Sequence, residues 1–282
     1  MAKNYLSIYA KSFNWAGFFL PKIKYKNCSA LYDFCRTVDN IVDDEGNLNL
    51  KRKNLIEFKK KFFEKDFSSS KIEKMWGLVD EFSISTKIIE DLFDGVETDL
   101  EENVRLNSRK DLLIYSYRVA GTVGLMMAKI LRVNSERGFN SAIDLGIAMQ
   151  LTNIARDVIE DKKRNRSYIH DDFITIKETI NLADLFYNSS FKSIKEIPFS
   201  CRFAILVARR VYRQIGNEIL KKKDLEDYKR AGKIFVTNIG KIKQTFLSLF
   251  DFIILIFLKP VNNSNDLRHE DIKKEINLNE RF

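Results

Sequence analysis

The sequence predicts an all-α protein built from long helices, and three observations support this. The 282 residues include 11 Gly and 3 Pro, too few for the many turns of an all-β fold. Apolar residues make up 45% of the chain, which is enough for one large core. Leu, Ile, Phe, Lys and Glu recur along most of the chain at the spacing of amphipathic helices.

Short polar or breaker segments separate the expected helices. They are Gly46, the run 68–70, Asn107 with Ser108, Gly138 and the region of Pro198. None is long enough to be a domain linker. The helices are expected near residues 4–18, 26–44, 49–66, 70–79, 83–103, 108–132, 138–163, 173–191, 197–222 and 228–258. A polar tail, residues 261–282, is expected to be frayed.

Two of these helices, 30–44 and 142–161, are apolar around most of their circumference, so we expect them in the middle of the bundle. Each nevertheless carries polar residues spaced three, four or seven positions apart. Residues at this spacing share a helix face, so they form a polar stripe. The first stripe is Tyr32, Arg36, Asp39 and Asp43, and the second is Gln150, Asn153, Asp157 and Asp161.

Paired carboxylates in buried helices are costly unless a cation or hydrogen bonds compensate them. One DxxxD pair alone would be weak evidence, but two matching pairs can converge across a cavity and hold divalent ions through oxygen. The chain has 2 His and 3 Cys, which favours Mg²⁺ over zinc or iron. Mg²⁺ commonly adds phosphate oxygens to its shell, so a diphosphate is the expected ligand.

Arg36 and Arg156 lie beside these carboxylates in the sequence. Each can clamp a phosphate or form a structural ion pair, and both interpretations remain open. In the helix near 108–132, Gly121 and Gly124 lie three residues apart, which favours close helix packing, clearance for a ligand chain, or both.

Composition narrows the possible partners and compartments. The formal charge of +9 suits phosphorylated substrates, nucleic acid or an anionic membrane, but base-stacking patterns are missing, so no nucleic acid is expected. The cysteines lack CxxC spacing, and the N-terminus lacks a cleavage pattern, so we expect a cytoplasmic protein. The apolar segment 246–258 is too short to span a bilayer, which leaves peripheral membrane contact or packing on the core.

Several segments together resemble the squalene and phytoene synthases, with bacterial phytoene synthase the nearest match. KSFNWAGFFLP followed by LYDFCRTVDNIVDD resembles the family's N-terminal signature and first aspartate-rich motif. YSYRVAGTVGLMM resembles its central signature, and AIDLGIAMQLTNIARDVIED with NRSYI resembles its second aspartate-rich motif. LFDGVETDL and ARRVYRQI resemble weaker blocks, so the similarity runs from about residue 11 to about 240.

The resemblance implies a single-domain isoprenoid synthase bundle with a central apolar cavity, spanning residues 1–260. It implies that Mg²⁺ (or Mn²⁺) and diphosphate are bound by Asp39, Asp43, Asn153, Asp157 and Asp161. It places substrate contacts at Tyr32, Arg36, Gln150 and Arg156, with Lys11 and Ser12 near a diphosphate. Tyr115 would stabilise positive charge near the reacting carbons.

The activity implied by the resemblance is the head-to-head condensation of two geranylgeranyl diphosphates to phytoene, through a cyclopropyl diphosphate and without NADPH. The enzyme is expected to be a monomer. The alternatives are squalene or dehydrosqualene synthesis from farnesyl diphosphate, and a non-catalytic homologue acting as an assembly factor. Two positions depart from the family pattern, Ile159 in place of Gly and His170 in place of Pro, and they put product release or chain preference in doubt more than the chemistry.

Overall fold

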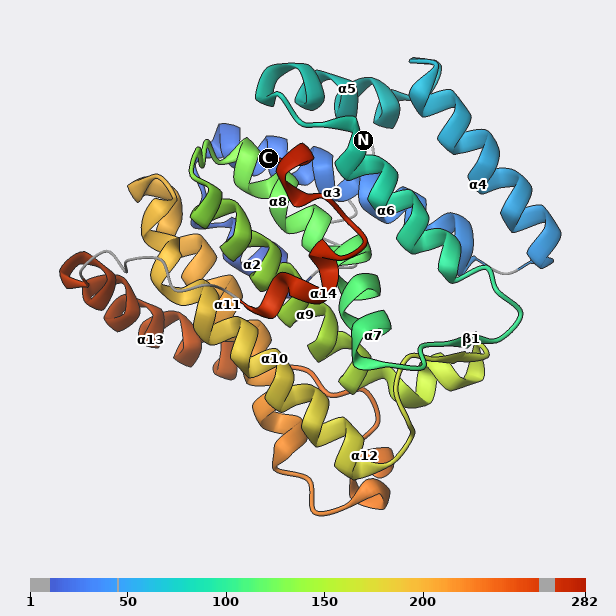
Figure 1. Ribbon diagram of the computed structural model, residues 1–282. Helices are drawn as coiled ribbons and strands as arrows, with labels where there is room; N and C mark the ends of the chain where they lie inside the picture. The colour runs from blue at the N-terminus through green and yellow to red at the C-terminus, as the bar shows by residue number, and fades with distance from the viewer. Residues whose placement is uncertain (1–10, 45, 259–266) are drawn as a thin grey trace.

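The computed structural model describes residues 11–44, 46–258 and 267–282, without the side chains of Lys11, Ser12 and Leu267. It is a helical bundle, as predicted, in which α9 passes through the middle (Figure 1). α9 packs against α8, α10 and α11, and α3 packs against α4, α5 and α8. The helices are α2 (Lys11–Gly17), α3 (Lys22–Asp43), α4 (Leu48–Phe63), α5 (Ser70–Phe82), α6 (Thr86–Thr98), α7 (Arg109–Ser116), α8 (Thr122–Ile130), α9 (Glu136–Lys163), α10 (Phe173–Ser193), α11 (Phe199–Leu220), α12 (Leu225–Ala231), α13 (Asn238–Phe257) and α14 (Glu270–Lys273).

Side-chain caps explain where several helices begin. The Ser108 hydroxyl accepts from the Asp111 amide at the start of α7, and Asp172 caps α10 through the Thr175 amide. Ser135 caps α9, which therefore begins at Glu136, two residues before the expected start at 138. Gly138 lies in the first turn and donates its amide to the Ser135 hydroxyl.

The helix expected near 108–132 contains a π-helical segment, Tyr117–Gly121, between α7 and α8. Here the glycines allow helices to touch through their backbones. A Cβ at Gly124 would lie 2.2 Å from the Ala142 oxygen, and one at Gly146 would lie 2.3 Å from the Ala120 oxygen. Close packing of α9 against α8 therefore requires Gly124, and its close packing against the π-helical segment requires Gly146.

The expectation of a single helix at 228–258 is wrong, because the chain forms α12 and α13 with a break between them. Gly232 follows α12 with a φ of +62°, a left-handed conformation that costs glycine little. Thr237 then caps α13 through the Gly240 amide. The helix near 83–103 is also shorter than expected, since α6 ends at Thr98.

The expectation of a frayed C-terminus is wrong for residues 267–282. The side chains of Ile272, Ile276 and Leu278 are buried in the core. Arg281 donates to both carboxylate oxygens of Asp91, at 2.9 and 3.0 Å. The tail carries isolated apolar residues and a cation whose partner is distant in sequence, and helical periodicity does not detect such contacts.

A two-residue parallel bridge, absent from the prediction, joins β1 (Val104–Arg105) to β2 (Arg166–Ser167). It ties the loop after α6 to the loop after α9 (Figure 1). This pairing holds the end of α6 next to Arg166, and both segments border the cavity inside the bundle.

Candidate active site

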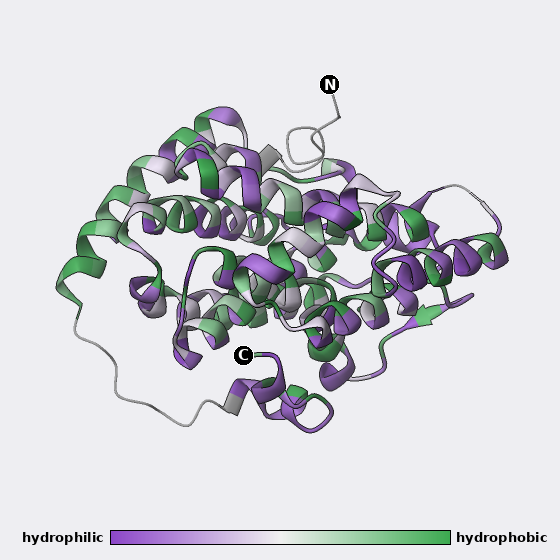
Figure 2. Ribbon diagram, turned by 90° about the horizontal axis from the view of Figure 1, so that it is seen from above, coloured by the Kyte–Doolittle hydropathy of each residue, from purple (hydrophilic) through white to green (hydrophobic). Residues whose placement is uncertain are grey.

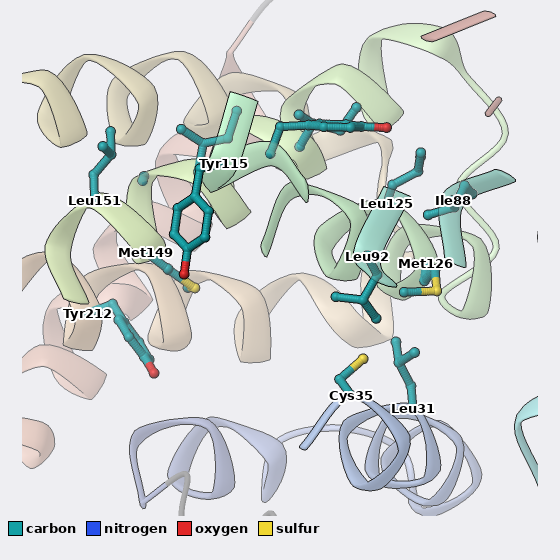
Figure 3. Packing of buried hydrophobic residues seen from close by; sticks show 14 of the residues in the cluster. Leu31, Cys35, Ile88, Leu92, Tyr115, Leu125, Met126, Met149, Leu151 and Tyr212 are labelled. Carbon is teal, nitrogen blue, oxygen red and sulfur yellow. The ribbon is translucent and has the colours of Figure 1, made fainter. Parts of the chain in front are cut away.

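A cavity of about 1120 Å³ lies inside the bundle, between α3, α8, α9 and α11. Its apolar walls are suited to a hydrocarbon chain. Figure 3 shows Tyr115, Met149, Tyr212 and Cys35 around this region, contributed by different helices. Apolar lining residues include Phe13, Val119, Val123, Met127, Leu145, Met149 and Ile205.

The two polar stripes line this same cavity. α3 contributes its stripe from one wall and α9 contributes the other, so the prediction that two helices bring their aspartates to one space agrees with the geometry. The lining residues from the predicted set are Tyr32, Arg36, Asp39, Asp43, Tyr115, Gln150, Asn153, Arg156, Asp157 and Asp161. Lys11 and Ser12 begin α2, and their side chains lie outside the described residues.

At the α3 wall, one arginine lies between the two carboxylates. Arg36 is 3.8 Å from Asp39 and 4.0 Å from Asp43. The Asp39 side chain is 41% exposed and lines the cavity. Burial raises the pKa of Asp39 to about 7, with Arg36 opposing the rise and Asp43 adding to it.

At the α9 wall, the two carboxylates differ. Asp157 is paired, because Arg156 donates to it through Nε at 2.8 Å and through a second guanidinium nitrogen, and Lys233 lies 3.2 Å away. Burial, together with the neighbouring charge of Asp157, raises the pKa of Asp161 to about 7. This wall therefore holds one ion-paired carboxylate, Asp157, and a second carboxylate, Asp161, whose ionised form an added cation would stabilise.

Sequence reasoning missed a group at the junction of the two walls. Asp99, at the end of α6, accepts hydrogen bonds from the Tyr115 hydroxyl at 3.0 Å and the Tyr168 hydroxyl at 2.6 Å. The two tyrosine rings stack at 4.8 Å. Arg166 donates to Asp43 at 2.8 Å and lies 3.9 Å from Asp99. LFDGVETDL contains Asp99, and NRSYI contains Arg166 and Tyr168. Both blocks resemble the family, but none of these three residues was assigned a role from the sequence.

The oxygen donors of the two stripes have features that suit a divalent cation. The Asn153 Oδ1 is buried without a hydrogen-bond partner, an orphaned acceptor inside the second stripe. The raised pKa values of Asp39 and Asp161 also indicate carboxylates that lack full compensation. Among the described residues, no three acidic, His or Cys side chains are grouped as a ready-made metal site. Such a set fits Mg²⁺ that completes its shell with ligand oxygens.

The two departures from the family pattern lie away from this donor set. Ile159 is partly buried and packs against the core, and His170 is exposed. Neither lines the cavity. The first two cysteines, Cys28 and Cys35, do line it as buried free thiols.

The family model for Squalene/phytoene synthase matches residues 6–175. The chain belongs to this family. A 15-cis-phytoene synthase of Paracoccus sp. (strain N81106 / MBIC 01143) is 35% identical over 174 residues, which cover 53% of this chain and 57% of that protein. A phytoene synthase of Pseudescherichia vulneris is 29% identical over 244 residues, covering 74% of this chain and 78% of the relative.

A solved structure supports the same assignment. A dehydrosqualene synthase in complex with a ligand superposes with a TM-score of 0.73 at 27% identity, covering 87% of this chain and 93% of that one. The predicted family and the all-α isoprenoid synthase fold are therefore confirmed. The matching relatives and the matching solved structure are synthases of the prenyltransferase type, which agrees with the expected class of enzyme.

Proposed function

We propose that this protein condenses two geranylgeranyl diphosphates head to head to phytoene, through a cyclopropyl diphosphate. The observation that carries the proposal is the meeting of two aspartate stripes, from α3 and α9, in one cavity whose other walls are apolar. Acidic groups suit a metal-bound diphosphate, and the apolar walls suit the prenyl chains. The phytoene synthases among the relatives support the choice of a twenty-carbon substrate.

The acidic side chains have assigned roles in this proposal. Asp39 and Asp43 on one wall, with Asn153, Asp157 and Asp161 on the other, would hold Mg²⁺ and the diphosphates. When bound, Mg²⁺ neutralises the charge that develops on a departing diphosphate.

Basic and aromatic side chains line the same cavity and would contact the diphosphates. Arg36 is placed to clamp a diphosphate beside Asp39 and Asp43, together with Tyr32 and Gln150 from the cavity walls. Arg156 donates to both carboxylate oxygens of Asp157 and lines the same cavity.

The apolar walls would exclude water from the carbocations. Tyr115 lines the cavity, and its hydroxyl donates to Asp99. A fixed aromatic face next to the prenyl carbons can stabilise positive charge.

Product analysis tests this function. Incubation with geranylgeranyl diphosphate and Mg²⁺, without NADPH, is expected to give a product with the mass of phytoene. A second candidate, dehydrosqualene synthesis, is favoured by the 27% identical dehydrosqualene synthase structure. Turnover of farnesyl diphosphate alone would establish that candidate and overturn the proposed substrate. No condensation product from either substrate would favour a non-catalytic homologue.

A further inference from the structure

Helix α13 has its apolar side turned away from the protein. Its polar residues Lys241, Gln244, Ser248 and Asp251 are buried. The exposed apolar set, each member between 45% and 81% accessible, is Ile239, Ile242, Phe246, Leu249, Phe250, Ile253, Ile254, Ile256 and Phe257. Figure 2 shows this strongly hydrophobic helix, coloured mostly green, at the left edge of the molecule. An amphipathic helix of a water-exposed surface has the opposite arrangement.

Specific polar contacts fix this orientation. Arg210 of α11 donates to both oxygens of Asp251, at 2.5 and 2.6 Å. Gln244 donates to Gln214 at 2.8 Å. Rotating the helix to bury its apolar face would expose Asp251 and leave the half-buried Arg210 without this partner. The packing therefore specifies an apolar outer face.

The apolar surface continues onto neighbouring elements through a row of rings. Phe252 of α13 packs against Phe199 at 5.0 Å and Phe203 at 6.2 Å, and Phe203 packs against Phe19 at 5.0 Å. Phe18, next to Phe19, is 74% exposed. We call the exposed apolar residues of α13, with Phe18, Phe19 and Phe199, the α13 face. A contiguous exposed apolar patch of this kind marks an interaction surface.

The charges around the α13 face are predominantly basic. The one acidic residue of α13, Asp251, is buried in its ion pair. Lys243 is exposed at the edge of the face, beside a groove of about 580 Å³ that also contains Arg210, ion-paired with Asp251, and Arg213, ion-paired with Asp184.

Two further cations lie beside the C-terminal part of α13. Lys195 donates to the Leu258 carbonyl at 2.8 Å, and Arg202 lies over the Phe199 ring at 5.6 Å. A basic rim attracts anionic headgroups, whereas a second copy of the chain would bring two like-charged rims together.

We infer that the α13 face is the surface through which the protein lies on an anionic phospholipid bilayer. In this arrangement α13 lies in the plane of the interface with its apolar side in the headgroup and acyl boundary. The basic rim contacts the phosphate groups. Among the described residues, no helix is long and apolar enough to cross a bilayer, so the contact is peripheral.

The α13 face also borders the cavity, a point that matters if the proposed function holds. The first turn of α13 supplies Asn238 and Lys241 to the cavity lining, and the corner between α2 and α3 supplies Gly17 and Leu20. The same two segments carry the exposed Ile239 and Phe18. On the proposed function, a hydrocarbon product would leave across this border into the acyl layer.

Vesicle sedimentation tests the inference on the full chain without substrate. The probes are phosphatidylglycerol and phosphatidylcholine vesicles mixed one to one, and vesicles of phosphatidylcholine alone. The protein is expected to sediment with the anionic vesicles, less in high salt, and weakly with the neutral ones. The triple variant Phe246→Gln, Phe250→Gln, Ile253→Gln is expected to reduce partitioning by about tenfold or more.

A matched triple variant changes equally exposed apolar residues elsewhere: Ile56→Gln, Ile174→Gln and Leu185→Gln. It is expected to bind vesicles as the wild type does. Absence of sedimentation by the wild type, or equal loss in both triple variants, would overturn the inference. A dimer in vesicle-free solution that the α13 triple variant dissociates would also overturn it, because the face would then join two copies.

Vesicle binding and turnover can be measured separately, so a failure of this inference can be distinguished from a failure of the proposed function. Only the product-release step rests on the proposed function. The α13 triple variant changes no cavity residue, so its turnover in detergent micelles is expected to equal that of the wild type. Vesicle binding with no condensation product would preserve the α13 face and overturn the function. Turnover in micelles without vesicle binding would do the reverse.

Discussion

Arg166 donates a hydrogen bond to Asp43 at 2.8 Å, and this contact ties the loop after α9 to the end of α3. The two residues are 123 positions apart in the sequence. Arg166 also lies 3.9 Å from Asp99, and its guanidinium reaches the Val42 carbonyl at 3.4 Å. One buried cation therefore joins the aspartate-bearing walls of the cavity.

Replacing this cation is expected to destabilise the protein. Arg166→Gln leaves Asp43 and the buried Asp99 without their shared partner, so the free energy of unfolding should fall by about 3 kcal/mol or more. Arg164→Gln is the matched control, because Arg164 is exposed and also contacts Asp43, at 3.2 Å; its effect should be about 1 kcal/mol or less. Urea unfolding measures both, and equal losses would contradict the role of Arg166.

The stability of the ligand-free protein is expected to depend on Asp161. Its pKa is about 7 when folded and about 4 when unfolded, so the folded state holds more protons between these values. The stabilising contribution is complete below about pH 4 and is lost as the pH rises through about 7.

Asp161→Asn removes that titration, so the difference in melting temperature between pH 5 and pH 8 should shrink, with the variant more stable than the wild type at pH 8. Thermal unfolding followed by circular dichroism measures this. Asp80→Asn, at an exposed position on α5, should leave the difference unchanged. An undiminished pH dependence in the Asp161 variant would show that the group does not titrate as described.

Close packing of α8 on α9 gives a third expectation. Gly124→Ala places a methyl group 2.2 Å from the Ala142 oxygen, an overlap with rigid backbone, and should cost about 2 kcal/mol or more. Gly77→Ala in α5 meets nothing within 4 Å and should stabilise by about 0.5–1 kcal/mol. Chemical denaturation compares them, and a Gly124 variant as stable as the wild type would mean that the helices can separate freely.

Helical periodicity was sufficient to predict the two stripes, because residues at fixed spacing on one helix must share a face. It could not show that Asp99 and Arg166 lie between them. Asp99 follows the last residue of α6 and Arg166 lies in the two-residue strand β2, and the bridge of β1 with β2 joins segments more than 60 positions apart. Periodicity also identified the apolar character of α13 but not its orientation, which depends on the ion pair between Arg210 and Asp251.

We expect the walls formed by α3 and α9 to bind one Mg²⁺-diphosphate together. Isothermal titration with inorganic diphosphate, with and without Mg²⁺, measures this binding for the wild type, Asp39→Asn and Asp157→Asn. We expect Mg²⁺-dependent binding that weakens by roughly tenfold to a hundredfold in each variant. Binding that ignores Mg²⁺, or that survives intact when either aspartate is replaced, would contradict this expectation.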